Sequence, residues 1–460
     1  MKMTKWRIFI FTIALIVFFT ILFLPQPHGL SVPGKRALAI FTLCLIFWVT
    51  NVIPLSVTGL LAIVLLPLLN VVDAKTAFSL FGNEAVFFIL GVFILAVALM
   101  KTGLSARLSI FFLSKFKKTP QKLLLGVIFS SAFLSFWMPE HAVAALMFPI
   151  ILEIADSLKL EPGTSSYGKA LFISLAWGAV IGGVATLLGG ARNPLAIGLL
   201  YERFKLKIGF LEWMIAIVPI VIIMLIFAYI NIRIFFKIDI KSVNPAEKVL
   251  TKKIKTLGPL SKDEKIVGVI LIITIICWII LSNKIGLANI SIFSAISLFI
   301  FNVIHWKEVE EYVNWGVILM YGGAIALGFA LAHTHAAEWL ANLFISKHRL
   351  STFLFIVLLS LIAKLLTEGI SNTAAVAILL PLGFAFGHNI NPIIIVYVVA
   401  VPAGLAFCLP IGTPPNAICY SAGYYKISDV GKVGLLLNLI SWIIFILMIK
   451  FYWPLIGLTF

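Results

Sequence analysis

The sequence predicts an all-α polytopic membrane protein, and composition, long apolar runs and an internal repeat are the observations that predict it. Of its 460 residues, 62% are hydrophobic and only 12% are charged, whereas a soluble domain carries about 25% charged residues. The apolar residues form long runs, while a transmembrane β-barrel shows short alternating segments. We therefore expect helices that cross a membrane several times.

The lengths of the apolar runs predict about eleven transmembrane helices. A membrane helix needs about 20 apolar residues. The predicted crossings lie near residues 8–24, 37–52, 55–70, 84–100, 168–188, 211–236, 265–281, 288–304, 314–332, 391–409 and 433–456. Two further apolar stretches, 122–156 and 352–387, are split by polar residues and are expected to be re-entrant hairpins. Residues 102–116 mix basic and apolar side chains, which favours an interfacial helix.

The distribution of basic residues predicts the topology. The formal net charge is +17, but the basic residues sit in short loops, so we expect the lipid bilayer as their partner and no nucleic acid. Residues 25–28 offer no small-residue cleavage site, which favours a first transmembrane helix over a signal peptide. The basic loops 101–122 and 233–265 then place the N-terminus in the cytoplasm and the C-terminus outside. The basic loops 203–207 and 347–349 are external exceptions to this rule.

Two polar interruptions mark the candidate site. Residues 367–373 include Ser-Asn-Thr, and residues 412–416 read Gly-Thr-Pro-Pro-Asn. Polar groups and broken backbone at membrane depth are costly unless they are buried in protein or line a cavity, so the two breaks indicate an ion or solute site. Lys364 and Glu368 lie four residues apart in the second hairpin, where Lys364 can extend toward the membrane surface or pair with Glu368.

An internal repeat relates the two halves of the chain. A single offset in residue number aligns Gly91 with Gly323, Ser135 with Thr367, and Pro149 with Pro381. A slightly smaller offset then aligns 189–193 with 412–416, because the first half has a longer connection. Five crossings separate equivalent points, and because this number is odd, the halves are expected to have opposite orientation. Inverted repeats place the substrate site near the middle of the membrane, where the halves meet.

The motifs Ser371-Asn372-Thr373 and Gly412-Thr413-Pro414-Pro415-Asn416, at this spacing, resemble the signatures of the divalent anion:sodium symporter family. The resemblance covers most of the chain. It implies a homodimeric secondary transporter of small divalent anions such as dicarboxylates, citrate or sulfate. It also implies coupling to sodium and an elevator-like movement of a transport domain against a scaffold, in the inner or plasma membrane, without an organic cofactor.

The resemblance also implies a domain division and a set of binding residues. Residues 1–120 and 241–350 form the scaffold with the cytoplasmic loop, and residues 121–240 and 351–460 form the two transport halves. In the second half, the residues carried over as sodium ligands are Thr367, Ser371, Asn372 and Gly412. The residues expected to lie against the anion are Ser371, Asn372, Thr373, Thr413 and Pro414.

The first half departs from the family pattern. Pro139-Glu140-His141 stands where the family has Ser-Asn-Thr, and residues 189–193 read Gly-Gly-Ala-Arg-Asn. Only Ser135, Gly189 and Asn193 keep the expected character, which puts a first sodium site at Ser135 and Gly189 in doubt.

The preferred hypothesis is that Arg192 supplies a fixed positive charge in place of the first sodium, with Glu140 as its ion-pair partner. An unpaired guanidinium within the membrane would be costly. His141 and Asn193 then complete the anion site, and His141 can also titrate near neutral pH. The alternative is a structural Glu140–Arg192 pair in a half-site that binds nothing.

Several functions stay open at this point. Sodium symport through one retained site is one; proton-coupled or exchange transport, with Glu140 and His141 as proton carriers, is another. A sodium/proton antiporter is a third. A membrane-embedded enzyme needs a nucleophile–base or metal set, and neither Glu140-His141 alone nor the four scattered cysteines provide one. We therefore expect a transporter and not an enzyme.

Overall fold

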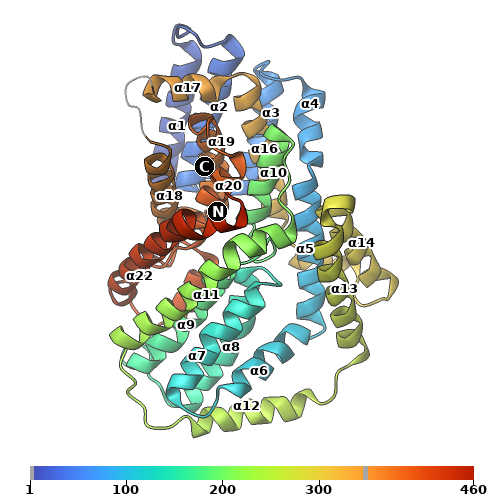
Figure 1. The fold of residues 1–460 in the computed structure, drawn as a ribbon, viewed down its shortest axis with the longest axis vertical. Coiled ribbons are helices and arrows are strands. Elements are labelled where there is room, and N and C mark those ends of the chain that lie inside the picture. The colour runs from blue at the N-terminus through green and yellow to red at the C-terminus, as the bar shows by residue number, and fades with distance from the viewer. Residues whose placement is uncertain (1–4, 346–350, 460) are drawn as a thin grey trace.

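The fold is helical throughout the part of the chain that the structure describes. The computed structural model describes residues 5–345 and 351–459, and this part contains no β-strand. The all-α prediction is confirmed. The predicted external loop at 347–349 lies outside the described residues. Figure 1 shows the first predicted hairpin, α7 (Pro120–Ser135) and α8 (Glu140–Ser157), in the lower part of the view, and the second, α18 (Thr352–Gly369) and α19 (Asn372–Phe386), in the upper part.

The other helices have the following bounds. They are α1 (Lys5–Phe23), α2 (Val32–Thr50), α3 (Leu55–Leu68), α4 (Ala74–Ser79), α5 (Glu84–Lys101), α6 (Leu104–Lys115), α9 (Ser166–Gly182), α10 (Arg192–Phe204), α11 (Phe210–Phe235), α12 (Asn244–Leu257), α13 (Lys262–Ile285), α14 (Leu287–Ile300), α15 (Trp306–Tyr312), α16 (Trp315–His333), α17 (Ala336–Ile345), α20 (Pro392–Ala400), α21 (Pro414–Tyr420) and α22 (Ile427–Leu447). The predicted interfacial helix corresponds to α6.

Eight helices among the described residues are long and apolar enough to cross a membrane. Seven coincide with predicted crossings, and the eighth is α18, the first arm of the second hairpin. The predicted crossings at 55–70, 168–188, 288–304 and 391–409 contain helices of 14, 17, 14 and 9 residues. A straight span needs about 20 residues. Helix length alone therefore supports seven of the eleven predicted crossings, and it adds α18, which was predicted as one arm of a hairpin.

Two helical paths are interrupted close to the aligned segments 189–193 and 412–416. α9 ends at Gly182 and α10 begins at Arg192, with irregular backbone between them. In the second half α20 ends at Ala400, a short 3₁₀ turn follows, and α21 begins at Pro414. Each break frees backbone carbonyl and amide groups that a continuous helix would have paired.

The internal repeat is visible in the positions at which helices begin. α3 and α14 begin at Leu55 and Leu287, and α8 and α19 begin at Glu140 and Asn372. Both pairs are separated by the same offset that aligns Ser135 with Thr367 in the sequence. The prediction of two related halves is confirmed in this respect.

The same offset relates two close helix contacts. α5 packs on α14, and α16 packs on α3. A Cβ atom added to Gly91 would lie 2.6 Å from the Cβ of Ser291, and one added to Gly323 would lie 2.2 Å from the carbonyl oxygen of Gly59. Gly59 and Ser291 are themselves equivalent positions of the repeat. Small residues at these positions let the helix backbones approach closely.

Replacing Gly323 with alanine tests the second contact. The added methyl group must displace the backbone of Gly59, and overpacking of this kind destabilises by about 1–3 kcal/mol. We expect Gly323→Ala to unfold at a lower temperature in a thermal melt of the detergent-solubilised protein. Gly431→Ala in α22 is the matched control, because no atom lies within 4 Å of its added Cβ. Equal behaviour of the two variants would contradict the contact.

Candidate functional site

The tips of both hairpins and both broken helices meet at one place. Glu140 begins α8, Arg192 begins α10 and Asn372 begins α19. The Arg192 guanidinium contacts the Glu140 carboxylate and lies 3.3 Å from the amide of Asn372, which in turn lies 3.0 Å from the carbonyl oxygen of Gly412. The structure thus brings together the polar segments of both halves, as the repeat predicts.

A buried ion pair occupies the first half of this site. Arg192 Nη1 donates to both carboxylate oxygens of Glu140, each at 3.2 Å. Arg192 is 1% exposed and Glu140 is 4% exposed. The predicted pairing of these residues is confirmed. Because a buried charge without a partner is strongly destabilising, each residue requires the other.

Three glycines make room for this pair. A Cβ added to Gly183 would lie 2.0 Å from Glu140 Oε2, and one added to Gly190 would lie 2.3 Å from Arg192 Nη1. Gly404, from the break of the second half, approaches the other edge of the guanidinium: its Cβ would lie 2.2 Å from Arg192 Nε. Arg192 is therefore held between the two halves, and its Nε and Nη2 are buried without an acceptor.

An oxygen cluster occupies the second half of the site. The Thr367 hydroxyl donates to the carbonyl oxygen of Ala403 (2.7 Å). One end of the Asn372 amide lies 2.5 Å from Thr367 Oγ1, 3.0 Å from Gly412 O and 3.3 Å from Ala403 O. With its nitrogen at this end, the amide donates to these oxygens, and its own oxygen accepts from Arg192 Nη1 (3.3 Å).

Turned the other way, the amide of Asn372 completes a cluster made only of oxygen atoms. Hydroxyl, amide and carbonyl oxygens are the ligands that hard cations prefer. Three of the predicted sodium ligands, Thr367, Asn372 and Gly412, therefore lie together. The carbonyl of Ala403 belongs with them and was not predicted. A backbone carbonyl carries no side-chain signal, and only the nearby break in the helical path indicates it.

The remaining predicted residues of the second half lie around this cluster. Ser371 is half-buried, and its carbonyl accepts from the backbone of α19. Thr373 is 8% exposed. Thr413 Oγ1 accepts from the backbone nitrogen of Asn416 (3.4 Å) and so caps α21, whose first residue, Pro414, is exposed.

Two asparagines at equivalent positions of the repeat donate hydrogen bonds to the irregular backbone of the two breaks. Asn193 Nδ2 donates to the carbonyl of Gly183 (3.2 Å), and Asn416 Nδ2 donates to the carbonyl of Ala406 (2.9 Å). Each acceptor lies ten residues before its asparagine, which confirms the predicted alignment of 189–193 with 412–416. Asn193 Oδ1 has no hydrogen-bond partner and is buried.

The first half contains no comparable oxygen cluster at the predicted positions. Ser135 Oγ is buried without a partner, and the Gly189 carbonyl accepts from the backbone nitrogen of Glu140 (2.8 Å). Across residues 5–345 and 351–459, no hydrogen bond or ion pair involves the half-buried side chain of His141. The ion pair thus stands where the second half has its oxygens.

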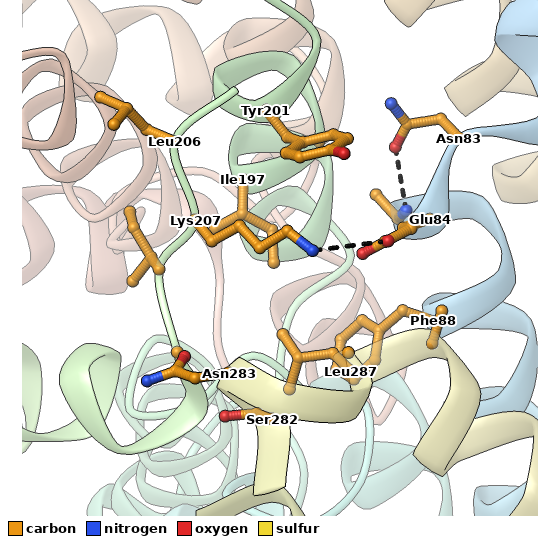
Figure 2. A pocket seen from close by; sticks show the side chains of 16 residues that line it. Asn83, Glu84, Phe88, Ile197, Tyr201, Leu206, Lys207, Ser282, Asn283 and Leu287 are labelled. Atoms are coloured by element: carbon orange, nitrogen blue, oxygen red, sulfur yellow. Dashed lines mark hydrogen bonds and ion pairs between the residues drawn. The ribbon is translucent and has the colours of Figure 1, made fainter. Parts of the chain in front are cut away.

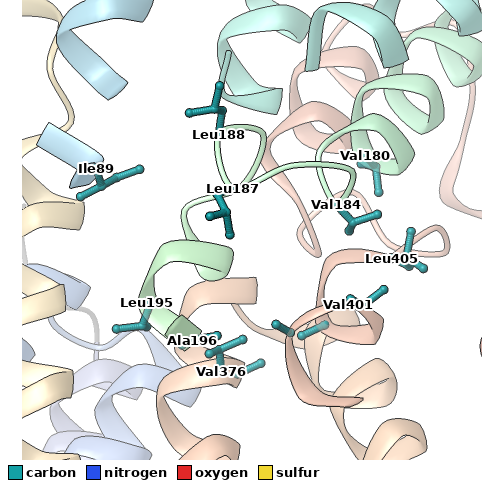
Figure 3. Close-up of a cluster of buried hydrophobic side chains, with 14 of the residues drawn as sticks. Ile89, Val180, Val184, Leu187, Leu188, Leu195, Ala196, Val376, Val401 and Leu405 are labelled. Carbon is teal, nitrogen blue, oxygen red and sulfur yellow. The ribbon is translucent and has the colours of Figure 1, made fainter. Parts of the chain in front are cut away.

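Buried apolar side chains pack around the two breaks. Figure 3 shows them gathered around the two breaks. The labelled residues are Ile89, Val180, Val184, Leu187, Leu188, Leu195, Ala196, Val376, Val401 and Leu405, all at most 1% exposed. Exclusion of water lowers the local dielectric constant and strengthens the interactions between the charges within.

A separate cavity of about 50 Å³ lies between α5, α10 and the α13–α14 junction (Figure 2). Lys207 crosses it, 3.5 Å from Glu84 Oε1 and 5.0 Å from the centre of the Tyr201 ring. None of the predicted site residues lines it. We therefore locate the candidate site at the closed polar cluster between the hairpin tips.

The comparisons with known proteins all lead to membrane transporters. The family described as the sodium:sulfate symporter transmembrane region matches residues 4–459. The chain is 30% identical to the sodium-dependent dicarboxylate transporter SdcS of Staphylococcus saprophyticus, with 95% of this chain and 90% of that protein covered. It is also 30% identical to SdcS of Staphylococcus aureus strain USA300, with 96% and 90% covered. Among solved structures, the YdaH transporter of Alcanivorax borkumensis shares the fold, with a TM-score of 0.53 at 14% identity and coverage of 83% of this chain and 90% of that one.

The buried pair predicts strongly non-additive substitutions. Glu140→Gln or Arg192→Met leaves one buried charge without its partner, and breaking a buried pair in this way costs about 3–5 kcal/mol. The double variant removes both charges, so we expect it to lose clearly less stability than the two single losses together. Thermal melts of the four proteins measure the difference. Losses that simply add would show that the two charges do not depend on each other.

Proposed function

This chain belongs to the sodium:sulfate symporter family, and from this premise we propose that it carries a dicarboxylate across the membrane in symport with sodium. As a member of this family it is a multi-pass membrane protein that couples anion transport to sodium, and it is a transporter and not an enzyme. The choice of a dicarboxylate is supported by the names of the two SdcS relatives.

The oxygen cluster of the second half is the proposed sodium site. Thr367 Oγ1, the Asn372 amide oxygen and the carbonyls of Ala403 and Gly412 surround the ion, with Ser371 beside them. The observation that carries this proposal is the end of the Asn372 amide that faces three oxygens within 3.3 Å. A sodium ion satisfies an oxygen at that position, so binding of the ion turns the amide oxygen toward the cluster.

This rotation of Asn372 links sodium to the anion. Without the ion, the amide oxygen accepts from Arg192 Nη1. With the ion bound, the amide nitrogen faces Arg192 instead, and two donors then point into the same space. An anionic carboxylate accepts from both, so the anion is held well only after sodium has bound. Thr373, Thr413 and Pro414 form the rest of the proposed anion site.

The first half contributes a fixed charge to the proposed mechanism. Arg192 takes the place of a first sodium ion, and Glu140 compensates its charge within the membrane. Ser135 and Gly189 are then not sodium ligands. This is supported by the carbonyl oxygen of Gly189, which already accepts a hydrogen bond from the backbone nitrogen of Glu140 (2.8 Å). Asn193 and the half-buried His141 are the further proposed contacts of the anion. The proposed mechanism therefore uses one sodium ion per transport cycle.

The proposal includes the architecture that the family resemblance implies. Eleven crossings, two re-entrant hairpins and oppositely oriented halves place residues 121–240 and 351–460 in a transport domain. Residues 1–120 and 241–350 form the scaffold against which it moves like an elevator. A homodimer in the cell membrane, with a cytoplasmic N-terminus and an external C-terminus, is part of the proposal. Its topology is supported by the basic loops at 101–122 and 233–265.

Uptake into proteoliposomes tests the proposed function. Labelled succinate, citrate and sulfate are offered separately to the purified protein, with sodium and pH gradients varied independently. We expect succinate uptake that requires an inward sodium gradient. Uptake of sulfate alone would refute the substrate class, and uptake that follows pH without sodium would indicate proton coupling. Ion flux without any anion substrate would indicate an antiporter.

Thr367→Val tests the proposed sodium site. Valine keeps the shape of threonine but removes one oxygen from the cluster, and loss of even an outer-shell partner of a metal site commonly lowers affinity by about 10–100-fold. We expect the sodium concentration for half-maximal succinate uptake to rise by about this factor. Ser135→Ala is the matched control, because Ser135 is the equivalent residue of the first half. A rise for Ser135→Ala with none for Thr367→Val would place the ion in the other half.

A further inference from the structure

Two charged side chains of α18 flank Thr367 and hold the break of the second half. The Glu368 carboxylate accepts from three consecutive backbone nitrogens, those of Phe407 (2.7 Å), Cys408 (3.1 Å) and Leu409 (3.0 Å). Asn438 Nδ2 of α22 also donates to it, at 2.5 Å. Glu368 thus gathers amide donors from the break and from a neighbouring helix around one carboxylate.

Lys364 holds the same segment through the opposite kind of group. Its ammonium nitrogen donates to the carbonyl of Leu405 (2.7 Å) and lies 5.2 Å from the centre of the Phe407 ring. Lys364 is 3% exposed. Extension of this side chain toward the membrane surface, one of the two sequence-based interpretations, is therefore wrong, and its hydrogen bond goes to the backbone and not to Glu368.

These contacts hold residues 405–409 in place, a segment that is neither helix nor strand. Unpaired backbone groups at membrane depth cost several kcal/mol each, and hydrogen bonds to a charged carboxylate are among the strong ones in proteins. With Lys364 on a carbonyl and Glu368 on three amides, α18 sets the position of residues 405–409.

The fixed segment lies between two proposed ligands of the sodium ion. Ala403 precedes it and Gly412 follows it. Gly412 itself packs against the end of α18, since a Cβ there would lie 3.2 Å from the carbonyl oxygen of Thr367 and 3.3 Å from that of Glu368. The one helix that supplies the Thr367 hydroxyl therefore also sets where the two carbonyls stand relative to it.

The first half supports its break differently. At the offset that aligns Ser135 with Thr367, the residues equivalent to Lys364 and Glu368 are Ala132 and Phe136. There the helix backbones touch directly, because a Cβ on Gly182 would lie 2.2 Å from the carbonyl oxygen of Ala132. Thr186 Oγ1 donates to the carbonyl of Phe136 (2.6 Å). The charged support thus accompanies the half that has the oxygen cluster.

We propose that Glu368, assisted by Lys364, is the positioning residue of the sodium site. Neither side chain touches the ion; they hold the carbonyls of Ala403 and Gly412 at the spacing that sodium requires. This inference rests on the proposed function, because it concerns the ion that drives transport.

Glu368→Gln is the decisive variant. Glutamine keeps the size of the side chain but turns one of the two accepting oxygens into a donor that faces backbone amides. Two quantities are measured on the full-length protein with sodium replaced by choline as needed: the sodium-dependent rise in melting temperature, which reports ion binding, and sodium-driven succinate uptake. We expect half-saturation by sodium to shift upward by at least about tenfold in both, because hydrogen bonds to a charged carboxylate are among the strong ones in proteins.

The anion separates positioning from a general structural role. At saturating sodium, we expect the succinate KM and the maximal rate of Glu368→Gln to stay close to those of the unchanged protein, and Glu368→Asp to restore part of the sodium affinity. Glu153→Gln is the control, since this half-exposed carboxylate pairs with Lys253 at the far end of α8. Its sodium response should not change.

Four outcomes would overturn the inference or its premise. An unchanged sodium half-saturation in Glu368→Gln, or a loss of maximal rate without a sodium shift, would refute the positioning role. If Glu368→Gln does not fold, Lys364→Met decides by the same two measurements, and an unchanged sodium response then refutes it. A protein without substitutions that shows neither sodium stabilisation nor sodium-driven uptake would refute the proposed function itself.

Discussion

The structure depends on the requirement that irregular backbone inside a membrane find its hydrogen-bond partners within the protein. Two helical paths break between hairpins, and every group freed there must be satisfied. Asn193 and Asn416 do this in equivalent ways, each through a carbonyl ten residues earlier. The carbonyls of Ala403 and Gly412, which lie in the same break, face the side chains of Thr367 and Asn372. The position of the candidate site is therefore a consequence of where the helices stop.

The two halves satisfy this requirement with different chemistry. The first half places a full positive and a full negative charge in direct contact, with Arg192 and Glu140 both almost completely buried. The second half has neutral oxygens at its centre. Its charged side chains, Lys364 and Glu368, contact the neighbouring backbone instead. The first half balances its own charges without an ion from solution, whereas the neutral oxygens of the second half can be satisfied either by the amide nitrogen of Asn372 or, in the proposed mechanism, by sodium. The same helical frame thus accommodates a buried ion pair in one half and a cluster of neutral oxygens in the other.

The sequence predicts much of this arrangement because its signals are local or repeated. Glycine, proline and asparagine positions predict the repeat, and the cost of a lone guanidinium predicts the pairing of Arg192 with Glu140. Other features have no such signal. Ala403 acts through its backbone, so its side chain reveals nothing. The contacts of Glu368 span about forty residues and depend on how the break folds back on α18. The shortness of α3 and α14 is likewise invisible in apolar runs that continue past the helix ends.

The closeness of Gly404 to Arg192 has an evolutionary consequence. The Arg192 guanidinium of the first half packs directly against the backbone of Gly404 in the second half. No methyl group would fit between them. A homologue without arginine at position 192 could carry a larger residue at position 404. A homologue with a larger residue at position 404 could not keep the arginine. Among homologues, the residues at positions 192 and 404 should therefore covary. At this contact, substitutions in one half of the chain constrain substitutions in the other.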